Sequence, residues 1–227
     1  MRTQNNILTL DTETVGTFDR PLVHDIGWMV TDKNFNVISK RRYLVKEFHI
    51  DQPWILKTSD FYSERQGLYR KAIKDATVEI KPWREVIKEF MKDLKGVKVM
   101  SAYNLAFDYK AINYTNNFFN GGDETLSKLI DKKTLLCIWN LACDTILDTD
   151  DYRGYATMKH FISDKGNYLS SAESCYAYLT QNDSYKEEHT ALADVEIEVD
   201  ILRYIVENCK GKVQYGLAYN CWKKIQK

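Results

Sequence analysis

The sequence lacks several features that mark membrane, exported or disordered proteins. No segment offers the long uncharged apolar run that a membrane helix needs, and no signal-like apolar stretch precedes Asp11. Proline occurs only 3 times and aromatic side chains are plentiful, so extensive disorder is not expected. We therefore expect a cytoplasmic protein without a membrane partner.

Cysteine usage and net charge argue against three further classes of protein. The 5 cysteines are odd in number, and no two of them form a CxxC pair, which argues against a disulfide or zinc framework. The 32 basic residues balance 32 acidic ones, so salt-driven wrapping of long duplex DNA is not expected. A nuclease stays compatible with this balance, because bound metal ions can supply positive charge at the phosphate.

What is present suits one α/β domain. No repeat, linker or low-complexity stretch divides residues 1–227, although a basic, aromatic extension occupies about 207–227. Apolar runs and turn signals predict five strands, at residues 7–10, 23–31, 37–45, 97–103 and 135–141. The short turn at 32–36 makes the second and third strands an antiparallel hairpin, and Gly16 and Pro21 mark the bend that joins the first strand to the second, so the first three strands are expected to be antiparallel. A crossover helix makes the fourth strand parallel to the first. The prediction is a five-stranded mixed sheet flanked by helices, with the fifth strand also parallel to the first.

Helical patterns occur in the second half of the chain. An apolar stripe between Pro82 and Gly96 predicts a helix, as do residues 107–119 and the capping-box spacing of residues 170–173. Residues 195–201 alternate as a strand would, yet apolar residues from Leu192 to Val206 recur at spacings of three and four. We interpret this segment as a helix. Residues 47–81 show no regular pattern.

Three acidic motifs follow one another along the chain: DTET at 11–14, NLAFD at 104–108 and HTALAD at 189–194. Together they supply four carboxylates and one imidazole, the groups that a two-metal phosphodiester hydrolase uses. Asp11 and Glu13 lie two apart at the end of a buried strand, so both can point at one cation cluster.

Each motif also has an ordinary structural explanation. A carboxylate at Asp108 is favoured by the dipole of the helix it begins, and Asn104 could cap the same turn. Phe107 is more often a core aromatic than a base-stacking group, and a histidine before a helix, such as His189, is usually a surface or capping residue. The order and joint spacing of the motifs favour function over these alternatives.

The three motifs resemble those of the DnaQ-like 3′–5′ exonucleases of the DEDD superfamily, which have a ribonuclease H-like fold. A histidine five residues before the last Asp is typical of the DEDDh subgroup, whereas the sister subgroup has tyrosine where this chain has Thr190. Two positions differ from the common family pattern, with Val15-Gly16 after the first motif and Tyr103 before Asn104. The similarity extends over about residues 6–205.

The resemblance implies a site and a mechanism. Asp11, Glu13, Asp108 and Asp194 would hold two divalent cations, Mg²⁺ or Mn²⁺, and Asp11 would bridge them. The imidazole of His189 would take a proton from the attacking water. Candidates for binding the terminal nucleotide are Thr14, Asn104 and Phe107.

The leading hypothesis is therefore a metal-dependent 3′–5′ exonuclease that releases nucleoside 5′-monophosphates from single-stranded nucleic acid. A proofreading subunit that works with a separate polymerase is an alternative, and a non-catalytic nucleic-acid-binding module is a second. The motifs do not discriminate between DNA and RNA, so the 3′ ends of both are candidate substrates. Some members of the family are homodimers, so a homodimer is one possible oligomeric state. The C-terminal extension could guide single-stranded nucleic acid by charge and stacking, but the favoured interpretation is a terminal helix that packs its aromatic side chains on the domain and exposes its lysines to solvent. The basic and aromatic residues of the extension are Lys210, Lys212, Lys223, Lys224, Lys227, Tyr215, Tyr219 and Trp222.

Overall fold

The computed structural model describes residues 5–209 and 213–226. Its strands are β1 (Ile7–Thr17), β2 (Arg20–Thr31), β3 (Val37–Val45), β4 (Glu79–Lys81), β5 (Val99–Ala102) and β6 (Thr134–Cys137). Its α-helices are α1 (Pro53–Leu56), α2 (Asp60–Lys74), α3 (Trp83–Lys95), α4 (Leu105–Asn120), α5 (Thr125–Ile130), α6 (Ile138–Ala142), α7 (Asp150–Met158), α8 (Ala172–Thr180) and α9 (Ala191–Asn208). Three further helical turns of other types are η1 (Glu47–Asp51), η2 (Cys143–Leu147) and η3 (Cys221–Ile225).

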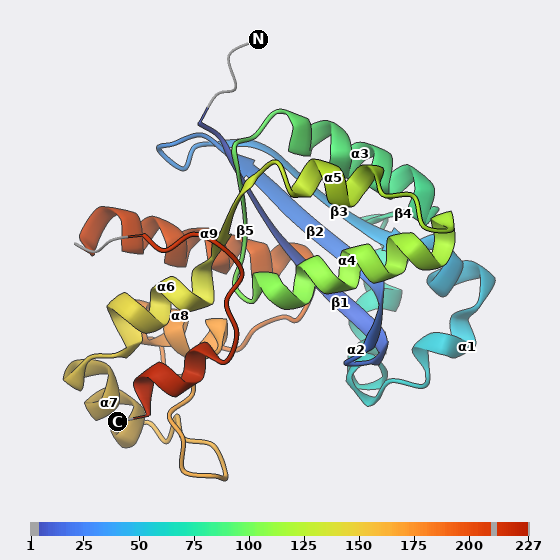
Figure 1. Ribbon diagram of the computed structural model, residues 1–227. Coiled ribbons are helices and arrows are strands. Elements are labelled where there is room, and N and C mark those ends of the chain that lie inside the picture. The colour runs from blue at the N-terminus through green and yellow to red at the C-terminus, as the bar shows by residue number, and fades with distance from the viewer. Residues whose placement is uncertain (1–4, 210–212, 227) are drawn as a thin grey trace.

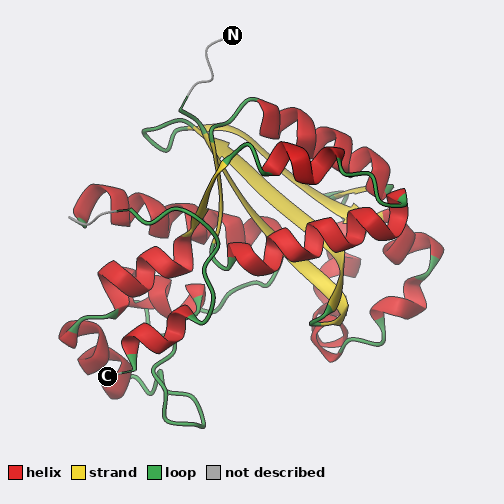
Figure 2. Cartoon of the chain, in the orientation of Figure 1, coloured by secondary structure: helices red, strands yellow, loops and turns green. Residues whose placement is uncertain are grey.

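The six strands form one mixed sheet in the order β4-β3-β2-β1-β5-β6. Figure 2 shows this sheet in yellow with helices packed around it. β1, β2 and β3 are antiparallel neighbours, whereas β5 runs parallel to β1 and β6 parallel to β5. The predicted strand directions are therefore confirmed. The predicted number of five is wrong, because the three-residue strand β4 is too short to show a pattern and pairs with β3 only after folding.

Two hydrophobic cores lie on opposite faces of this sheet. Helices α3, α4 and α5 cover one face, where Leu8 and Leu10 of β1 pack (Figure 1). Helices α6, α8 and α9 build the second core, which Ile7 joins from the other face of β1. Because side chains alternate along a strand, Asp11 and Glu13 share the face of Ile7 and point toward the α9 side.

The expected helices at 83–95, 107–119 and 195–201 are all present, as α3, α4 and α9. Helix α9 shows that spacings of three and four outweighed the local alternation. The prediction at 135–141 is partly wrong, since β6 ends at Cys137 and α6 follows directly.

Residues 47–81 are more ordered than their sequence indicates. They hold η1, α1 and the fifteen-residue helix α2 before β4. Helix α2 buries only Tyr62 and Tyr69, so it lacks the continuous apolar stripe by which an amphipathic helix is found in a sequence.

The start of α8 also differs from the expectation. The N-cap is Ser171, whose hydroxyl accepts a hydrogen bond from the backbone N–H of Ser174, and not Ser170. Glu173 forms no capping box, because its carboxylate accepts hydrogen bonds from the Lys186 ammonium and the Glu187 backbone N–H.

The C-terminal extension runs beside β6 and is mostly irregular. The Gly216 N–H donates to the Leu135 carbonyl, and the Lys224 ammonium contacts Asp144 at 2.6 Å. Tyr215 and Tyr219 are 64% and 69% exposed, so the expected packing of these aromatics is wrong. Among residues 213–226, only η3 is helical. Lys210, Lys212 and Lys227 lie outside the described residues, so the structure does not test the expectations for them. Within the described ranges, none of the helices is both long enough and apolar enough to cross a membrane.

Candidate active site

Gly27 of β2 lets the first turn of α9 lie directly against the sheet. It pairs with Asp11 in the β1–β2 register. A Cβ atom at Gly27 would lie 2.6 Å from the carbonyl carbon of Ala191 and 2.6 Å from the backbone nitrogen of Leu192. A side chain here would push α9 outward, so this glycine sets how closely α9 approaches β1.

β1 brings the first two carboxylates to this contact. Glu13 is only 8% exposed, and Asp11 is half-buried. The strand pairing shifts register between Glu13 and Thr14, where the regular ladder is interrupted. Both predicted carboxylates therefore lie on the α9 side just before the irregularity.

Asp108 reaches the same region from the first turn of α4. It is 4% exposed, and its Oδ1 accepts a hydrogen bond of 2.8 Å from the Thr12 hydroxyl. Burial raises the pKa of Asp108 to about 7, although the Thr12 hydroxyl counteracts part of this rise. Asn104 is the N-cap of α4 through its backbone carbonyl, and its side chain makes no capping hydrogen bond.

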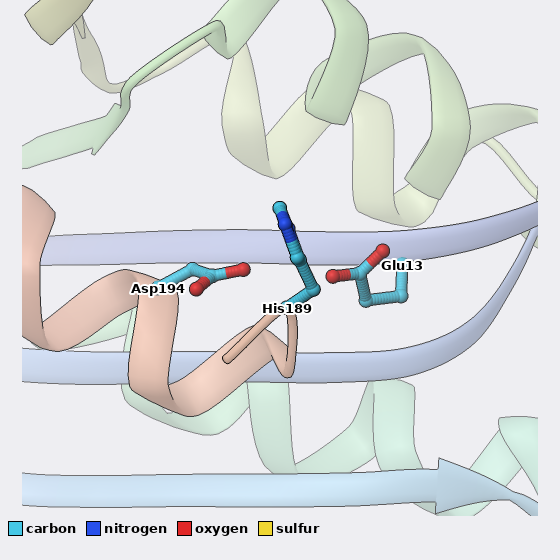
Figure 3. A group of neighbouring side chains, drawn as sticks. All are labelled: Glu13, His189 and Asp194. Carbon is cyan, nitrogen blue, oxygen red and sulfur yellow. The ribbon is translucent and has the colours of Figure 1, made fainter. Parts of the chain in front are cut away.

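His189 and Asp194 complete the cluster from the start of α9. One ligand atom each of Glu13, His189 and Asp194 lie within 4.8 Å of one another, and the two carboxylates flank the imidazole in Figure 3. Asp194 is 8% exposed, and its Oδ1 has no hydrogen-bond partner among residues 5–209 and 213–226. Burial raises the pKa of Asp194 to about 8, and the charge of Glu187 adds to the rise.

The charges of neighbouring carboxylates act on Asp11. Burial raises the pKa of Asp11 well above its usual range, and four further carboxylates add to this rise: Asp108, Glu198, Glu13 and Asp194. Adjacent buried carboxylates cannot all stay ionised unless protons or cations compensate them. The unpartnered oxygen of Asp194 and the oxygen-only donor set of the carboxylates fit a hard divalent cation.

Glu198 is a member of this cluster that the motif analysis missed. It follows Asp194 by one helical turn, is 3% exposed, and has an Oε2 atom without a partner in the described part of the chain. Burial raises its pKa, with Asp108 adding, whereas the Tyr103 backbone N–H counteracts the rise. The spacing of four from Asp194 was the available signal, since residues four apart share one helix face.

His189 has an unusual backbone conformation. Its φ angle is 53°, in the left-handed region that residues other than glycine rarely adopt. Its ring and the Phe61 ring meet in a T-shaped arrangement with centroids 5.3 Å apart, and its Nδ1 lies 3.7 Å from a Glu187 oxygen. Burial lowers the pKa of His189, and the nearby Arg65 charge lowers it further. The neutral, proton-accepting form is therefore favoured near neutral pH.

Phe61 and Arg65 were missed because they lie on α2, in the stretch without a visible pattern. The Arg65 guanidinium lies 3.7 Å above the Phe61 ring, and the Phe61 ring in turn contacts His189. Burial and the charge of Asp194 raise the pKa of Glu13, and the charge of Arg65 offsets part of this rise. No local signal in the sequence indicates that this pair borders the site.

A cavity of about 360 Å³ opens beside the carboxylates. Asp11, Asp108 and Asn104 line it, together with Phe107, whose ring stacks on Phe18 at a centroid distance of 5.9 Å. Such a volume is ordinary for a small-ligand site. Thr14 is half-buried and does not line this cavity, so the structure separates it from the other two predicted nucleotide-binding residues.

No model of a known protein family matches this sequence, and no curated protein matches it. Several solved structures do match its fold. Exonuclease I of E. coli in complex with a dA16 oligonucleotide has a TM-score of 0.56 and 17% identity, over 90% of this chain and 41% of that chain. A zinc-bound complex of the same enzyme with single-stranded DNA has a TM-score of 0.57 and 16% identity, with the same coverage. Cell-death related nuclease 4 has a TM-score of 0.57 and 11% identity, over 94% of this chain and 67% of that chain.

The similarity to these nucleases lies in the fold. This chain spans about two-fifths of the exonuclease I chain, so more than half of that enzyme has no counterpart here. At 11% to 17% identity the alignments establish a shared architecture and not a shared reaction. The expected α/β, ribonuclease H-like fold is thereby confirmed.

Proposed function

We propose that this protein is a metal-dependent 3′–5′ exonuclease that hydrolyses single-stranded nucleic acid to nucleoside 5′-monophosphates. One observation carries the proposal: three motifs far apart in sequence converge, with Glu13 and Asp194 beside His189 and with the charges of Asp108, Glu13 and Asp194 acting on Asp11. A stable fold does not need such a cluster, because each added like charge costs free energy in a buried site.

The proposed metal ligands are Asp11, Glu13, Asp108 and Asp194. All four are carboxylates, which suit Mg²⁺ or Mn²⁺, and the resemblance to the exonuclease family implies that they would hold two ions. Bound there, the cations would polarise the scissile phosphate, lower the pKa of the attacking water and stabilise the leaving 3′-oxygen.

His189 is the proposed general base. Its lowered pKa keeps the imidazole neutral, so it can accept the proton of the attacking water on a ring nitrogen. The carboxylates of Glu13 and Asp194 lie close enough to stabilise the imidazolium that forms. Contact with Phe61 restricts how the ring can turn.

The terminal nucleotide would enter the cavity beside the carboxylates. Phe107 and Phe18 offer stacked rings for its base, and Asn104 offers its amide at the cavity wall. Two of the matched exonuclease I structures contain a dA16 or a dT13 oligonucleotide, which supports a single-stranded substrate for this chain as well. Thr14 has a weaker case, because it lies outside the cavity.

Digestion of end-labelled DNA and RNA oligomers tests this proposal. We expect mononucleotides released from the 3′ end with Mg²⁺ or Mn²⁺, and none after chelation. Asp11→Asn should reduce the rate by at least on the order of 10³-fold, since it removes the charge of one of the proposed metal ligands. Asp19→Asn is the matched control, because the Asp19 side chain is 90% exposed at the β1–β2 turn.

His189→Ala separates the base from the metal ligands. We expect a rate loss on the order of 10²–10⁴-fold with Mn²⁺ binding retained. Internal cuts, or full activity in Asp11→Asn, would contradict an exonuclease of this kind. Loss of Mn²⁺ binding in His189→Ala would instead make this residue a ligand.

A further inference from the structure

Glu198 is a buried carboxylate to which the described part of the fold supplies no cation. It lies in α9, is 3% exposed, and forms no ion pair within the described ranges. Its Oε2 atom has no hydrogen-bond partner there either. A charged oxygen removed from water without a partner is costly, so its retention at this depth needs an explanation.

Its position directs that oxygen toward the candidate metal site. Asp194 and Glu198 are four residues apart in α9, so their side chains leave the same face of the helix. Glu198 lines the same cavity as Asp11 and Asp108, and its charge acts on both of those carboxylates. It therefore borders the cluster on the side where β1 meets α4.

The neighbouring Glu196 shows what an ordinary glutamate of this helix does. Its side chain is 48% exposed and forms a 2.8 Å ion pair with Lys40. Helix α9 thus carries one glutamate with a solvent-exposed cationic partner and, two residues later, one buried among like charges. A general preference for glutamate in α9 explains the first and not the second.

We propose that Glu198 is a fifth carboxylate of the metal site, which helps Asp11 and Asp108 to bind a divalent cation. The inference rests on the proposed function, since it concerns the same cations. A bound cation would compensate the unpartnered oxygen, and Glu198 would increase the affinity of the site. Asp194 and Glu198 would then present two carboxylates to the site from one rigid helix.

Manganese titration calorimetry on the full chain, without nucleic acid, tests the role of Glu198. Glu198→Gln keeps the size of the side chain and removes its charge, and Glu196→Gln is the matched control. We expect Mn²⁺ affinity at the weaker of the two binding events to fall by about 10–100-fold in Glu198→Gln. Glu196→Gln should bind Mn²⁺ as the wild type does.

Thermal unfolding of the metal-free protein supplies a second readout. In slightly alkaline buffer with a chelator, Glu198→Gln should melt at a higher temperature than the wild type, because it removes one of several buried like charges. Addition of Mn²⁺ should then stabilise this variant less than it stabilises the wild type. Glu198→Asp keeps the charge on a shorter side chain, and it should fold and bind Mn²⁺ more weakly.

The outcomes distinguish this inference from the function on which it rests. If Glu198→Gln binds Mn²⁺ as the wild type does and melts at a lower temperature without metal, Glu198 has a structural role and the inference is wrong. If Glu198→Gln fails to fold, undiminished Mn²⁺ affinity in Glu198→Asp would equally overturn it. Absence of Mn²⁺ binding by the wild type would overturn the proposed function as well.

Discussion

Glu13 and Asp25 face each other across β1 and β2, yet the fold treats the two carboxylates in opposite ways. They are direct partners in the antiparallel register, and both are buried. Asp25 has a dedicated cation, whereas Glu13 lies among further acids and an imidazole. A buried carboxylate is therefore not by itself a functional signal; the charge that surrounds it decides.

The charge of Asp25 is compensated within the fold by hydrogen bonds and an ion pair. The Arg42 guanidinium donates from Nη2 to Oδ2 of Asp25 at 2.8 Å and from Nε to each oxygen at 3.1 Å. Oδ2 of Asp25 also accepts a 3.4 Å hydrogen bond from the backbone N–H of Ala191. This pair thus connects β2 and β3 to the first turn of α9, and we expect it to act through stability and through the placement of His189.

The largest stability effect should come from removing the cation of that pair. Arg42→Met leaves Asp25 buried without compensation, which should cost about 3–5 kcal/mol of unfolding free energy. Arg41→Met is the control, because Arg41 pairs with Asp93 at a more exposed site of β3 and should contribute about 1 kcal/mol or less. Chemical denaturation measures both. Equal losses in the two variants would show that Asp25 does not depend on Arg42.

A smaller loss should follow from separating α9 and β1. Gly27→Ala places a methyl group against the backbone of Ala191 and Leu192, and the overpacking should cost about 1–3 kcal/mol. Because the shift moves Asp194 away from Asp11, Mn²⁺ affinity should fall in the same variant. Denaturation and calorimetry measure the two effects.

Gly67→Ala is the control for that substitution. Gly67 lies in α2, and a Cβ atom added there would meet no described residue within 4 Å, so alanine should stabilise the helix by about 0.5–1 kcal/mol. Unchanged stability and unchanged Mn²⁺ affinity in Gly27→Ala would contradict the close approach of α9 that we describe.

The last expected effect is a pH dependence that metal removes. Burial raises the pKa of Asp108 to about 7 and of Asp194 to about 8, from an ordinary 3.8. The folded state therefore holds these protons more tightly than the unfolded state, and their contribution to stability is lost as pH rises from about 4 to about 8. Saturating Mn²⁺ should flatten that decline, since the cation replaces the protons.

Melting temperatures measured across that pH range, with chelator and with Mn²⁺, check this expectation. Asp194→Asn is the informative variant, because it removes one titrating carboxylate and should show a shallower decline in chelator. A metal-free protein whose stability rises throughout the window would show that the cluster is not electrostatically strained. The contrast with the Asp25 pair would then disappear.

Local patterns explain why much of the fold could be predicted. The apolar stripe of α3 and the repeating spacing of α9 report directly on which side chains face a core, so both helices were found. Strand directions followed from connection length, since a short turn allows only antiparallel pairing. The acidic motifs lie within β1, at the start of α4 and at the start of α9, so two of the three mark the beginning of a helix.

The remaining residues depend on contacts between distant segments. Helix α2 carries no clear apolar stripe, so nothing in its own sequence places Phe61 against His189 or Arg65 near Glu13. Glu198 shares its spacing from Asp194 with many solvated helix pairs, and only its burial in the folded chain distinguishes it.

By itself the sequence determined which acidic and imidazole groups are available and which elements carry them, since both depend on neighbours along the chain. Only the tertiary structure decided that Glu13 lies among further acidic side chains and that Asp25 forms an ion pair with Arg42. The physical reason is that the free energy of a buried charge depends on what surrounds it in space. Those surroundings come from β1, β3, α4 and α9, which meet only when the chain has folded.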